Sequence, residues 1–200
     1  DWSSDVCSSD LTVGARAVEN GEVKPGDRVL VMGPGTVGQT IAVMARAAGA
    51  EVTIVGKGDP DRLACLRALG FERLIDLQDK AFAEAAGPAR FDVVFEANGV
   101  PATINQGLGV LRRWGILVVC GIHAAPASVD LNRLNREQLQ IRGSNRASRA
   151  TWGRAVDLLV AEGDKLRPMI THRLPLSRAV EGFELARRKT ASKVMLLPNA

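Results

Sequence analysis

Apolar runs and helix-spaced apolar positions alternate along most of this chain. Residues 28–32 (RVLVM) are nearly all apolar, which predicts a strand buried on both faces of a sheet. After a glycine-rich turn, apolar residues recur at helical spacing until Gly49, and residues 51–55 form a second apolar run. The same alternation predicts strands at 73–77, 91–96, 115–121 and 139–143, helices at 59–69, 79–86 and 101–111, and a connector at 129–135.

Strands that alternate with helices in this way indicate an α/β fold. Right-handed crossovers place helices on both faces, so we expect a doubly wound parallel sheet of six strands, the Rossmann fold, over residues 28–143. Residues 144–200 predict a C-terminal helical segment. It should contain a helix around 152–160 that ends at Gly163, a connector at 168–172, a helix capped by Ser177 and a strand at 194–197. These elements are too few for a core of their own, so we expect them to pack on a domain outside this chain.

The first eleven residues (DWSSDVCSSDL) stand apart from this pattern. They form a near-repeat with neither helical nor strand periodicity, and they resemble translated sequencing adapter. We expect residues 1–11 to be a non-native or disordered tail, residues 12–27 to lead into the domain, and the natural start of the protein to be missing.

The composition of the 200 residues narrows the function classes. Hydrophobic residues make up 46% and charged residues 24%, as in a soluble globular protein, and no apolar run reaches the ~20 residues of a membrane helix. The net charge is +4, but 26 basic residues are interleaved with 22 acidic ones, and Tyr is absent. We therefore expect neither a nucleic-acid nor a membrane partner. Cys7, Cys65 and Cys120 are too far apart for a disulfide framework or a metal knuckle, which favours a reducing cytoplasm.

A glycine loop between the first strand and the first helix carries the clearest chemistry. Gly33, Gly35 and Gly38 form the pattern G-x-G-x-x-G, with Thr36 and Val37 opening the helix. Gly33 would permit the tight turn, Gly35 would let a pyrophosphate approach the backbone, and Gly38 would let helix and strand pack closely. The N–H groups at the helix start then suit phosphate binding. A purely structural turn is the alternative.

The end of the second strand bears on the choice between NAD and NADP. NAD-binding domains place a carboxylate there for the ribose hydroxyls, but this chain has Gly56-Lys57-Gly58. Lys57, helped by Arg62, would suit a 2′-phosphate, so the pattern favours NADP over NAD. Asp59 and Asp61 come slightly later and look better placed as helix caps. The alternative is that Lys57 is a surface lysine without a cofactor role.

At this level of detail the chain resembles the medium-chain dehydrogenase family, in its zinc-dependent alcohol, sorbitol and threonine dehydrogenase branch. The resemblance runs from about Gly14 to Pro198. It rests on these stretches in order: KPGDRVLVMGPGTVGQTIAVMARAAGAEV, DRLACLRALG, FDVVFEANGVPATINQGLGVLRRWGILVVCGI, VDLNRLNREQLQIRGS and ITHRLPLSRAVEGFELARRKTASKVMLLP.

The resemblance implies further cofactor contacts at matching positions. Residues after the fourth strand should lie near the adenosine and the nicotinamide ribose, residues that end the fifth strand should line the nicotinamide side, and one basic residue should face the pyrophosphate. In that order, these are Asn98, Gly99 and Val100; Cys120, Gly121 and Ile122; and Lys193.

The same resemblance implies no metal or catalytic residue in this chain. Family members carry their zinc ligands in an N-terminal domain, which would precede Gly14 and is absent. His123 and His172 look too isolated to form a site, and Cys120 reads as a small core residue.

The expected function is that of an oxidoreductase fragment. The parent would transfer a hydride between an alcohol or polyol-type substrate and a nicotinamide cofactor, with zinc in the intact parent only. The alternatives are a zinc-independent quinone or enoyl reductase of the same superfamily, and a bare dinucleotide-binding module without catalysis. The family also implies a homodimer or homotetramer at full length, joined through the sixth strand.

Overall fold

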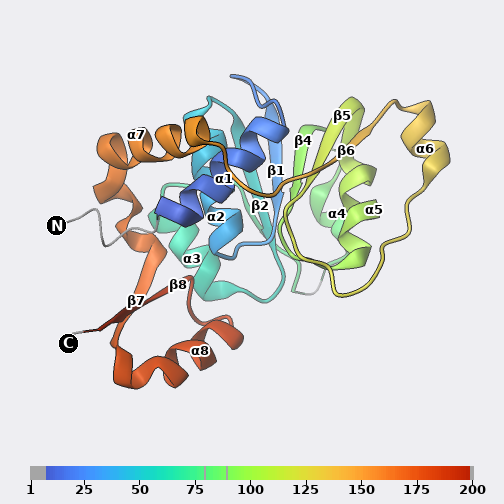
Figure 1. The fold of residues 1–200 in the computed structure, drawn as a ribbon. Coiled ribbons are helices and arrows are strands. Elements are labelled where there is room, and N and C mark those ends of the chain that lie inside the picture. Colours follow the sequence, from blue (N-terminus) through green and yellow to red (C-terminus); the bar gives the residue numbers. More distant parts are fainter. Residues whose placement is uncertain (1–7, 79, 89, 199–200) are drawn as a thin grey trace.

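A six-stranded parallel sheet forms the centre of the molecule (Figure 1). The computed structural model describes residues 8–78, 80–88 and 90–198. In spatial order the strands are β3 (Leu74–Asp76), β2 (Glu51–Gly56), β1 (Arg28–Met32), β4 (Phe91–Glu96), β5 (Leu111–Val119) and β6 (Gln140–Gly143). All neighbouring pairs are parallel. This is the doubly wound fold that the sequence predicts, and the expected fold class is confirmed.

Helices cover both faces of the sheet, and each face has its own hydrophobic core. In β1, Val29 and Val31 point into one core, while Leu30 and Met32 point into the other. Because side chains alternate across a strand, a strand buried on both faces must be apolar throughout. The first core lies under α1 (Ser8–Asn20), α2 (Thr36–Ala47), α3 (Pro60–Ala68) and α7 (Arg149–Leu166), and the second lies under α4 (Phe82–Ala86) and α5 (Pro101–Val110).

The C-terminal part adds a second, small sheet. After α7 and a 3-10 turn (Arg167–Met169), β7 (Ile170–Pro175) pairs in parallel with β8 (Lys193–Leu197). Between them lie a second 3-10 turn (Leu176–Arg178) and α8 (Ala179–Arg187). Figure 1 shows this unit below α7, to one side of the main sheet. The apolar side chains Leu176, Val180 and Phe183 are exposed on it.

Two expectations about the ends of the chain need correction. Residues 8–11, expected to belong to a non-native or disordered tail, are not disordered: they form the first turn of α1, and Leu11 is fully buried in the first core. Residues 1–7 of that tail lie outside the described residues. The C-terminal segment was expected to pack elsewhere, but Ala155, Leu159 and Leu166 of α7 belong to the first core.

Several element boundaries also differ from the sequence patterns. The connector expected at 129–135 contains α6 (Leu131–Arg136), capped by Asp130, which accepts a hydrogen bond from the Arg133 N–H. The strand expected at 115–121 begins at Leu111, and α7 continues past Gly163. The connector expected at 168–172 contains the start of β7, and Ser177 lies in a 3-10 turn rather than capping α8. The helix expected from 79 begins at Phe82.

Candidate cofactor site

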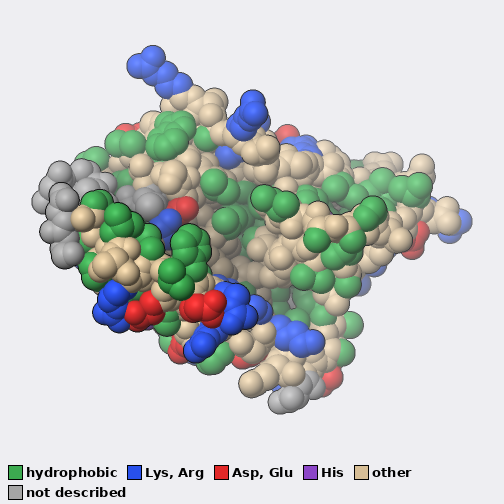
Figure 2. Space-filling model, turned by 60° about the horizontal axis from the view of Figure 1, so that its bottom comes forward, with side chains coloured by type: hydrophobic (Ala, Val, Ile, Leu, Met, Phe, Trp, Pro, Cys, Tyr) green, Lys and Arg blue, Asp and Glu red, His purple; other side chains and the backbone are tan. Residues whose placement is uncertain are grey.

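The carboxyl ends of β1 and β4 mark the point where the strand order reverses. The chain continues from β1 to β2 and β3 on one side, then crosses over to β4, β5 and β6 on the other. In open α/β sheets, ligands bind in the crevice at this switch point. Figure 2 looks onto this face and shows a hollow near its centre. Three loops meet there, at residues 33–38, 97–103 and 120–123.

The three glycines of the first loop have different surroundings. Gly33 has a φ of +118°, which favours glycine, and a Cβ there would lie 2.5 Å from Asn98 Oδ1. A Cβ at Gly38 would overlap the carbonyl oxygen of Gly33, so helix α2 can approach β1 only without a side chain there. At Gly35, in contrast, the nearest atom to a Cβ would be Arg62 Nη1, 3.9 Å away. Only Gly35 therefore faces open space.

The N-terminus of α2 opens directly from this loop. Gly35 is the N-cap, and no side chain among the described residues caps it. The N–H groups of the first turn are therefore available to an anion, and the helix dipole adds partial positive charge. Thr36, in that turn, donates its hydroxyl to the carbonyl of Ser192. The first turn of α2 is thus fastened to the C-terminal segment.

A cleft of 540 Å³ lies beside the loop on the β2 side. Its walls come from the ends of β1 and β2, from α4 and from the residues after β4. Apolar side chains make up much of the lining, with Lys57, Lys80 and Lys189 as the basic residues and Asp59 as the carboxylate. The full set is Met32, Val55, Gly56, Lys57, Asp59, Leu77, Lys80, Ala81, Phe82, Asn98, Val100, Ala102, Thr103, Gln106 and Lys189.

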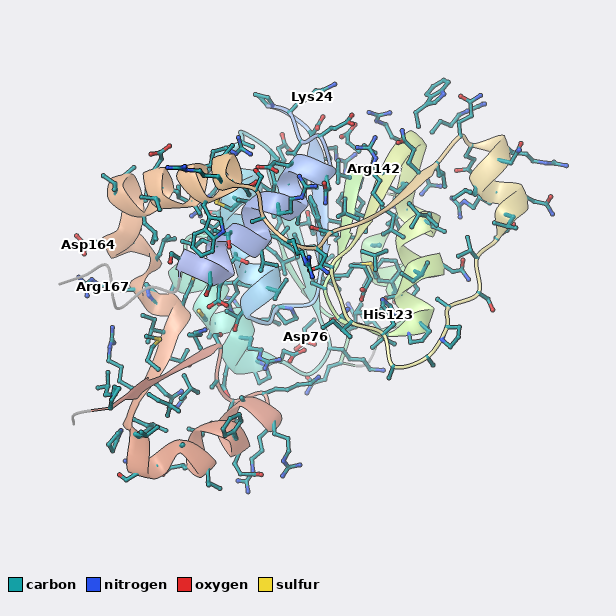
Figure 3. The ribbon with its side chains drawn as sticks, in the orientation of Figure 1. Lys24, Asp76, His123, Arg142, Asp164 and Arg167 are labelled. Atoms are coloured by element: carbon teal, nitrogen blue, oxygen red, sulfur yellow. The ribbon has the colours of Figure 1, made fainter. Side chains whose placement is uncertain are left out.

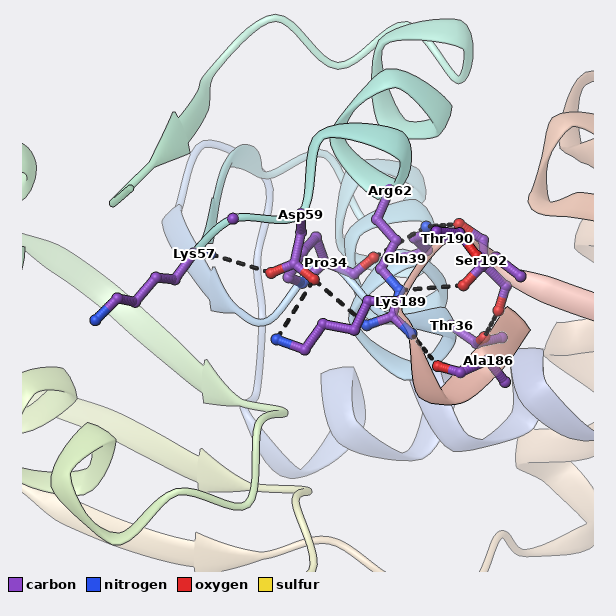
Figure 4. Close-up of polar contacts among 12 residues, drawn as sticks. Pro34, Thr36, Gln39, Lys57, Asp59, Arg62, Ala186, Lys189, Thr190 and Ser192 are labelled. Atoms are coloured by element: carbon purple, nitrogen blue, oxygen red, sulfur yellow. Dashed lines mark hydrogen bonds and ion pairs between the residues drawn. The ribbon is translucent and has the colours of Figure 1, made fainter. Parts of the chain in front are cut away.

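The carboxylate of Asp59 is the centre of the polar contacts at the end of β2 (Figure 4). Its side chain is only 5% exposed and accepts a hydrogen bond from the Lys57 N–H at 3.1 Å. Arg62 Nη1 lies 3.5 Å from it and Lys189 Nζ 3.7 Å. Asp59 stands at the N-cap of α3 but makes no side-chain cap bond to it. Its charge is therefore compensated by two cations, one of them from the C-terminal segment.

Lys57 and Arg62 do not point the same way. The Lys57 side chain extends away from Asp59, as Figure 4 shows. Arg62 instead turns toward the C-terminal segment, donating from Nε to the Ala191 carbonyl at 3.1 Å and from Nη2 to the Ala186 carbonyl at 3.4 Å. The sequence suggested that Arg62 reaches back to assist Lys57. The structure does not bring these two side chains together, because the guanidinium of Arg62 is hydrogen-bonded to two backbone carbonyls.

Lys193 is also engaged by a neighbouring element. Its Nζ lies 2.7 Å from Asp10 Oδ2 in α1. The adjacent Ser192 accepts a hydrogen bond from Gln39 Nε2 at 2.7 Å. Residues 190–193 therefore lie against α1 and α2, close to the glycine loop.

Glu96, the most buried polar group of the site, was not among the residues predicted from the sequence. This residue ends β4 and is fully buried. Its Oε1 accepts from the Asn98 N–H at 2.8 Å, the Gly99 N–H at 2.9 Å and Thr103 Oγ1 at 3.0 Å. Its Oε2 lies 3.0 Å from His123 Nε2. A carboxylate at the end of the apolar strand FDVVFE was the available signal. His123, which looked too isolated to form a site, has this buried carboxylate as a neighbour.

The third loop packs tightly on the second. The N–H groups of Cys120 and Gly121 both donate to the carbonyl of Glu96, at 2.8 and 3.0 Å. A Cβ at Gly99, where φ is +70°, would overlap the Ile122 carbonyl oxygen, and a Cβ at Gly121 would overlap the Gly99 nitrogen. The Ile122 side chain itself is 96% exposed.

The thiol of Cys120 is held in its neutral form. Burial and, secondarily, the negative charge of Glu96 raise its pKa to about 12, although a hydrogen bond with Ser144 acts in the opposite direction. A protonated thiol is a weak nucleophile. Cys120 therefore contributes packing rather than reactivity.

The described part of the chain contains neither a cluster of metal-ligand side chains nor a helix suited to span a membrane. Nowhere in residues 8–78, 80–88 and 90–198 do three or more His, Cys, Asp or Glu side chains come together as metal ligands would. The same ranges contain no helix that is both long and apolar enough to cross a bilayer. Zinc, which the resemblance implies for the parent, does not fit these residues.

Comparisons with known proteins agree with this geometry. The profile of the zinc-binding dehydrogenase family matches residues 36–161. Sorbitol dehydrogenase from Macaca fascicularis is 30% identical over 192 residues, which cover 93% of this chain and 54% of that enzyme. Among solved structures, L-idonate 5-dehydrogenase from Escherichia coli superposes with a TM-score of 0.84 and 26% identity, over 98% of this chain and 57% of that one. 2R,3R-butanediol dehydrogenase from Bacillus subtilis superposes with a TM-score of 0.83 and 25% identity, over 96% of this chain and 56% of that one.

The chain thus spans about half the length of the curated relatives it matches. The family profile covers α2, which is the helix that opens from the glycine loop, the strands β2 to β6 and most of α7. The match includes β4, β5 and the loops that follow them at the switch-point crevice, and it begins just after β1 and Gly35. The chain belongs to the zinc-binding dehydrogenase family.

Proposed function

We propose that this chain is the nicotinamide-dinucleotide-binding part of an oxidoreductase acting on an alcohol or polyol-type substrate. The observation that carries the proposal is the contrast within the glycine loop. Gly33 and Gly38 have no room for a side chain, whereas Gly35 faces open space at the N-terminus of α2. A pyrophosphate needs this combination of a close backbone approach and free N–H groups.

The remaining contacts follow from the position of the pyrophosphate. The adenosine half would enter the cleft on the β2 side, between Gly56, Asn98 and Val100. The other half would cross the switch point toward residues 120–122. The nicotinamide ring, when bound, accepts or gives up the hydride, while the protein orients it. Zinc would be held by a part of the parent outside the described residues.

We further propose NADP as the preferred cofactor. Lys57, Lys80 and Lys189 surround the end of β2, where a 2′-phosphate would lie. Asp59 would repel that phosphate, but Arg62 and Lys189 offset its charge. A charge-assisted contact with one of these lysines is worth on the order of 1.5–3 kcal/mol, or about ten-fold or more in affinity.

Two other functions remain as candidates. A zinc-independent quinone or enoyl reductase of the same superfamily would use the same cofactor site. A bare dinucleotide-binding module would bind the cofactor without chemistry. The coding sequence upstream of Gly14 in an intact gene separates them, since a cluster of Cys, His and Glu there would mark the metalloenzyme.

The experiment is a titration of the purified chain with NADPH and NADH. We expect binding of both, tighter for NADPH, and no oxidation of alcohols with or without added zinc. Lys57→Asp should reverse or abolish the preference. Tighter NADH binding by the wild type would overturn the choice of NADP, and alcohol turnover by the chain alone would contradict its role as a binding part. Absence of any dinucleotide binding would overturn the whole proposal.

A further inference from the structure

The buried carboxylate of Glu96 joins the two loops that follow β4 and β5. One oxygen receives the backbone N–H groups of Asn98 and Gly99, and the other lies 3.0 Å from His123 Nε2. Isolated buried charges are costly, and they persist where hydrogen-bond donors surround them. Here the donors come from residues 98–103 on one side and from His123 on the other. The Glu96 side chain is therefore the common anchor of both loops.

The contact with His123 places an imidazole nitrogen against the second carboxylate oxygen. An ionised carboxylate only accepts hydrogen bonds, so with Glu96 ionised and Nε2 carrying the proton, His123 is the donor. The imidazole is 16% exposed, and its Nδ1 is buried without a hydrogen-bond partner among the described residues. The contact with Glu96 is thus the polar interaction that holds this ring. Figure 3 shows His123 at the edge of the sheet that carries the carboxyl ends of the strands.

His123 follows directly on Ile122, whose backbone and side chain have opposite surroundings. The Ile122 carbonyl lies against Gly99, where not even a Cβ would fit, while the side chain is 96% exposed. The packed backbone fixes the place of this exposed side chain, so that a ligand bound at this edge of the sheet would contact it. Glu96 and His123 hold the backbone that presents it.

The position of Ile122 matches one half of a dinucleotide. The cleft with Lys57 and Asp59 lies on the β2 side of the switch point, and the glycine loop lies at its centre. A dinucleotide that straddles this point must extend its other half over β4 and β5. The 120–123 loop follows β5 and therefore faces the nicotinamide half alone.

We infer that Glu96 and His123 are a positioning pair that holds the loop carrying Ile122 against the nicotinamide half of the cofactor. This inference rests on the proposed function. Neither residue touches the reacting atoms in this assignment. His123 acts through Glu96 and through the backbone of residues 121–123.

Calorimetric titration of the 200-residue chain tests the pair with matched ligands. The probes are NADH and NADPH, with ADP-ribose and 2′-phospho-ADP-ribose as counterparts that lack the nicotinamide ring. His123→Leu removes the donor but leaves the Cys120 and Gly121 N–H bonds to the Glu96 carbonyl in place. We expect affinity for NADH and NADPH to fall roughly five- to ten-fold, with the two ring-less ligands changing less than two-fold.

Three further variants make the result specific. His123→Gln keeps an N–H donor of similar reach and should recover most of the affinity. His172→Leu changes the other described histidine, which contacts Thr171 away from the cleft, and should leave all four ligands unaffected. Ile122→Ser alters only an exposed side chain, so it should fold normally and show the same ligand split even if His123→Leu does not fold.

The possible failures are distinguishable. The positioning role would be overturned if a variant weakened the binding of all four ligands equally. It would also be overturned if either His123→Leu or Ile122→Ser left the affinity for NADH and NADPH unchanged. Wild-type chain that binds ADP-ribose as tightly as NADH would overturn it too, while leaving the dinucleotide site intact. Wild-type chain that binds none of the four ligands would overturn the proposed function and this inference with it.

Discussion

Arg62 in α3 donates a hydrogen bond from Nε to the backbone carbonyl of Ala191, 3.1 Å away and 129 positions further along the chain. A second bond joins its Nη2 to the Ala186 carbonyl. With the bond from Thr36 to Ser192, these contacts fasten the C-terminal segment to the glycine loop and its neighbouring helix. A residue that the sequence suggested for cofactor selection is thus mainly structural.

Replacing Arg62 should therefore affect stability more than selectivity. Arg62→Ala leaves two backbone carbonyls without their donor, and we expect the free energy of unfolding to fall by about 1–2 kcal/mol in chemical denaturation. The ratio of NADPH to NADH affinity should fall less in this variant than in one that lacks Lys57, because Lys189 still offsets the charge of Asp59. Lys57→Ala is the matched comparison, with a lower ratio and unchanged stability. A ratio that falls in Arg62→Ala as far as in Lys57→Ala would restore Arg62 to the 2′-phosphate site.

Gly35 and Gly38 should respond to the same substitution in opposite ways. Gly35 has a φ of −69° with extended ψ, which any residue adopts, and its Cβ direction is open. Gly35→Val should keep the fold and abolish binding, because the side chain takes the space of the pyrophosphate. Gly38→Val would meet the Gly33 carbonyl and should cost at least ~2 kcal/mol of stability. Circular dichroism and calorimetry check both, and unchanged affinity in Gly35→Val would rule out the pocket.

Cys120 should be inert to alkylation near neutral pH. Its pKa is raised from 9.0 to about 12, first by burial and then by the charge of Glu96, and burial also raises the pKa of Cys65. In a Cys7→Ser background, iodoacetamide at pH 8 should label the chain only after unfolding. Rapid labelling of Cys120 in the folded chain would contradict a buried, neutral thiol.

The same pKa shift predicts a loss of stability in alkali. A raised pKa in the folded state stabilises the fold fully below about pH 9, and this contribution disappears as the pH rises from 9 toward 12. Between pH 8 and 10.5 the wild type should lose on the order of 1–2 kcal/mol more than Cys120→Ala. Parallel pH profiles for the two proteins would show that Cys120 does not contribute to the alkaline loss.

The sixth strand should join two subunits in the full-length parent. Among the described residues, β6 pairs only with β5, and the Ile141 side chain is 39% exposed. An unpaired edge strand presents free N–H and C=O groups, which are a template for association. We expect a dimer by sedimentation, which Ile141→Lys should weaken, whereas Val160→Lys, on an exposed site of α7, should not. A monomeric parent at micromolar concentration would exclude this interface.

What could be predicted from the sequence depended on how local each signal is. β1, β2 and β4 were predictable because burial on both faces leaves an unbroken apolar run. The start of β5 was not, since Arg112, Arg113 and Trp114 are exposed there. Residues 8–11 were missed because Leu11 is one apolar residue among Ser and Asp, and its burial comes from packing against α2.

The same contrast between local signals and long-range packing applies to the residues of the candidate site. The surroundings of the three glycines follow from one turn between a strand and a helix, so their spacing alone indicated which of them have no room for a side chain. The pair of Glu96 and His123 spans 27 positions, and the contacts of Arg62 span 124 and 129. No periodicity or spacing rule reaches that far. Only the packing of the loops brings these groups together.

The hydrogen bonds of Glu96 also differ in how strongly they constrain which residues can occur at the partner positions. Two of them reach backbone N–H groups, and at position 98 almost any residue would supply that group, whereas position 99 is restricted to glycine by its φ of +70° and by the Ile122 carbonyl. The bond to His123 depends on the identity of that side chain. Substitutions at position 98 therefore leave the backbone hydrogen bonds to Glu96 in place. Loss of the histidine should be accompanied by another donor or by a change at position 96. In an alignment of related genes, covariation with position 96 should appear at 123 and not at 98.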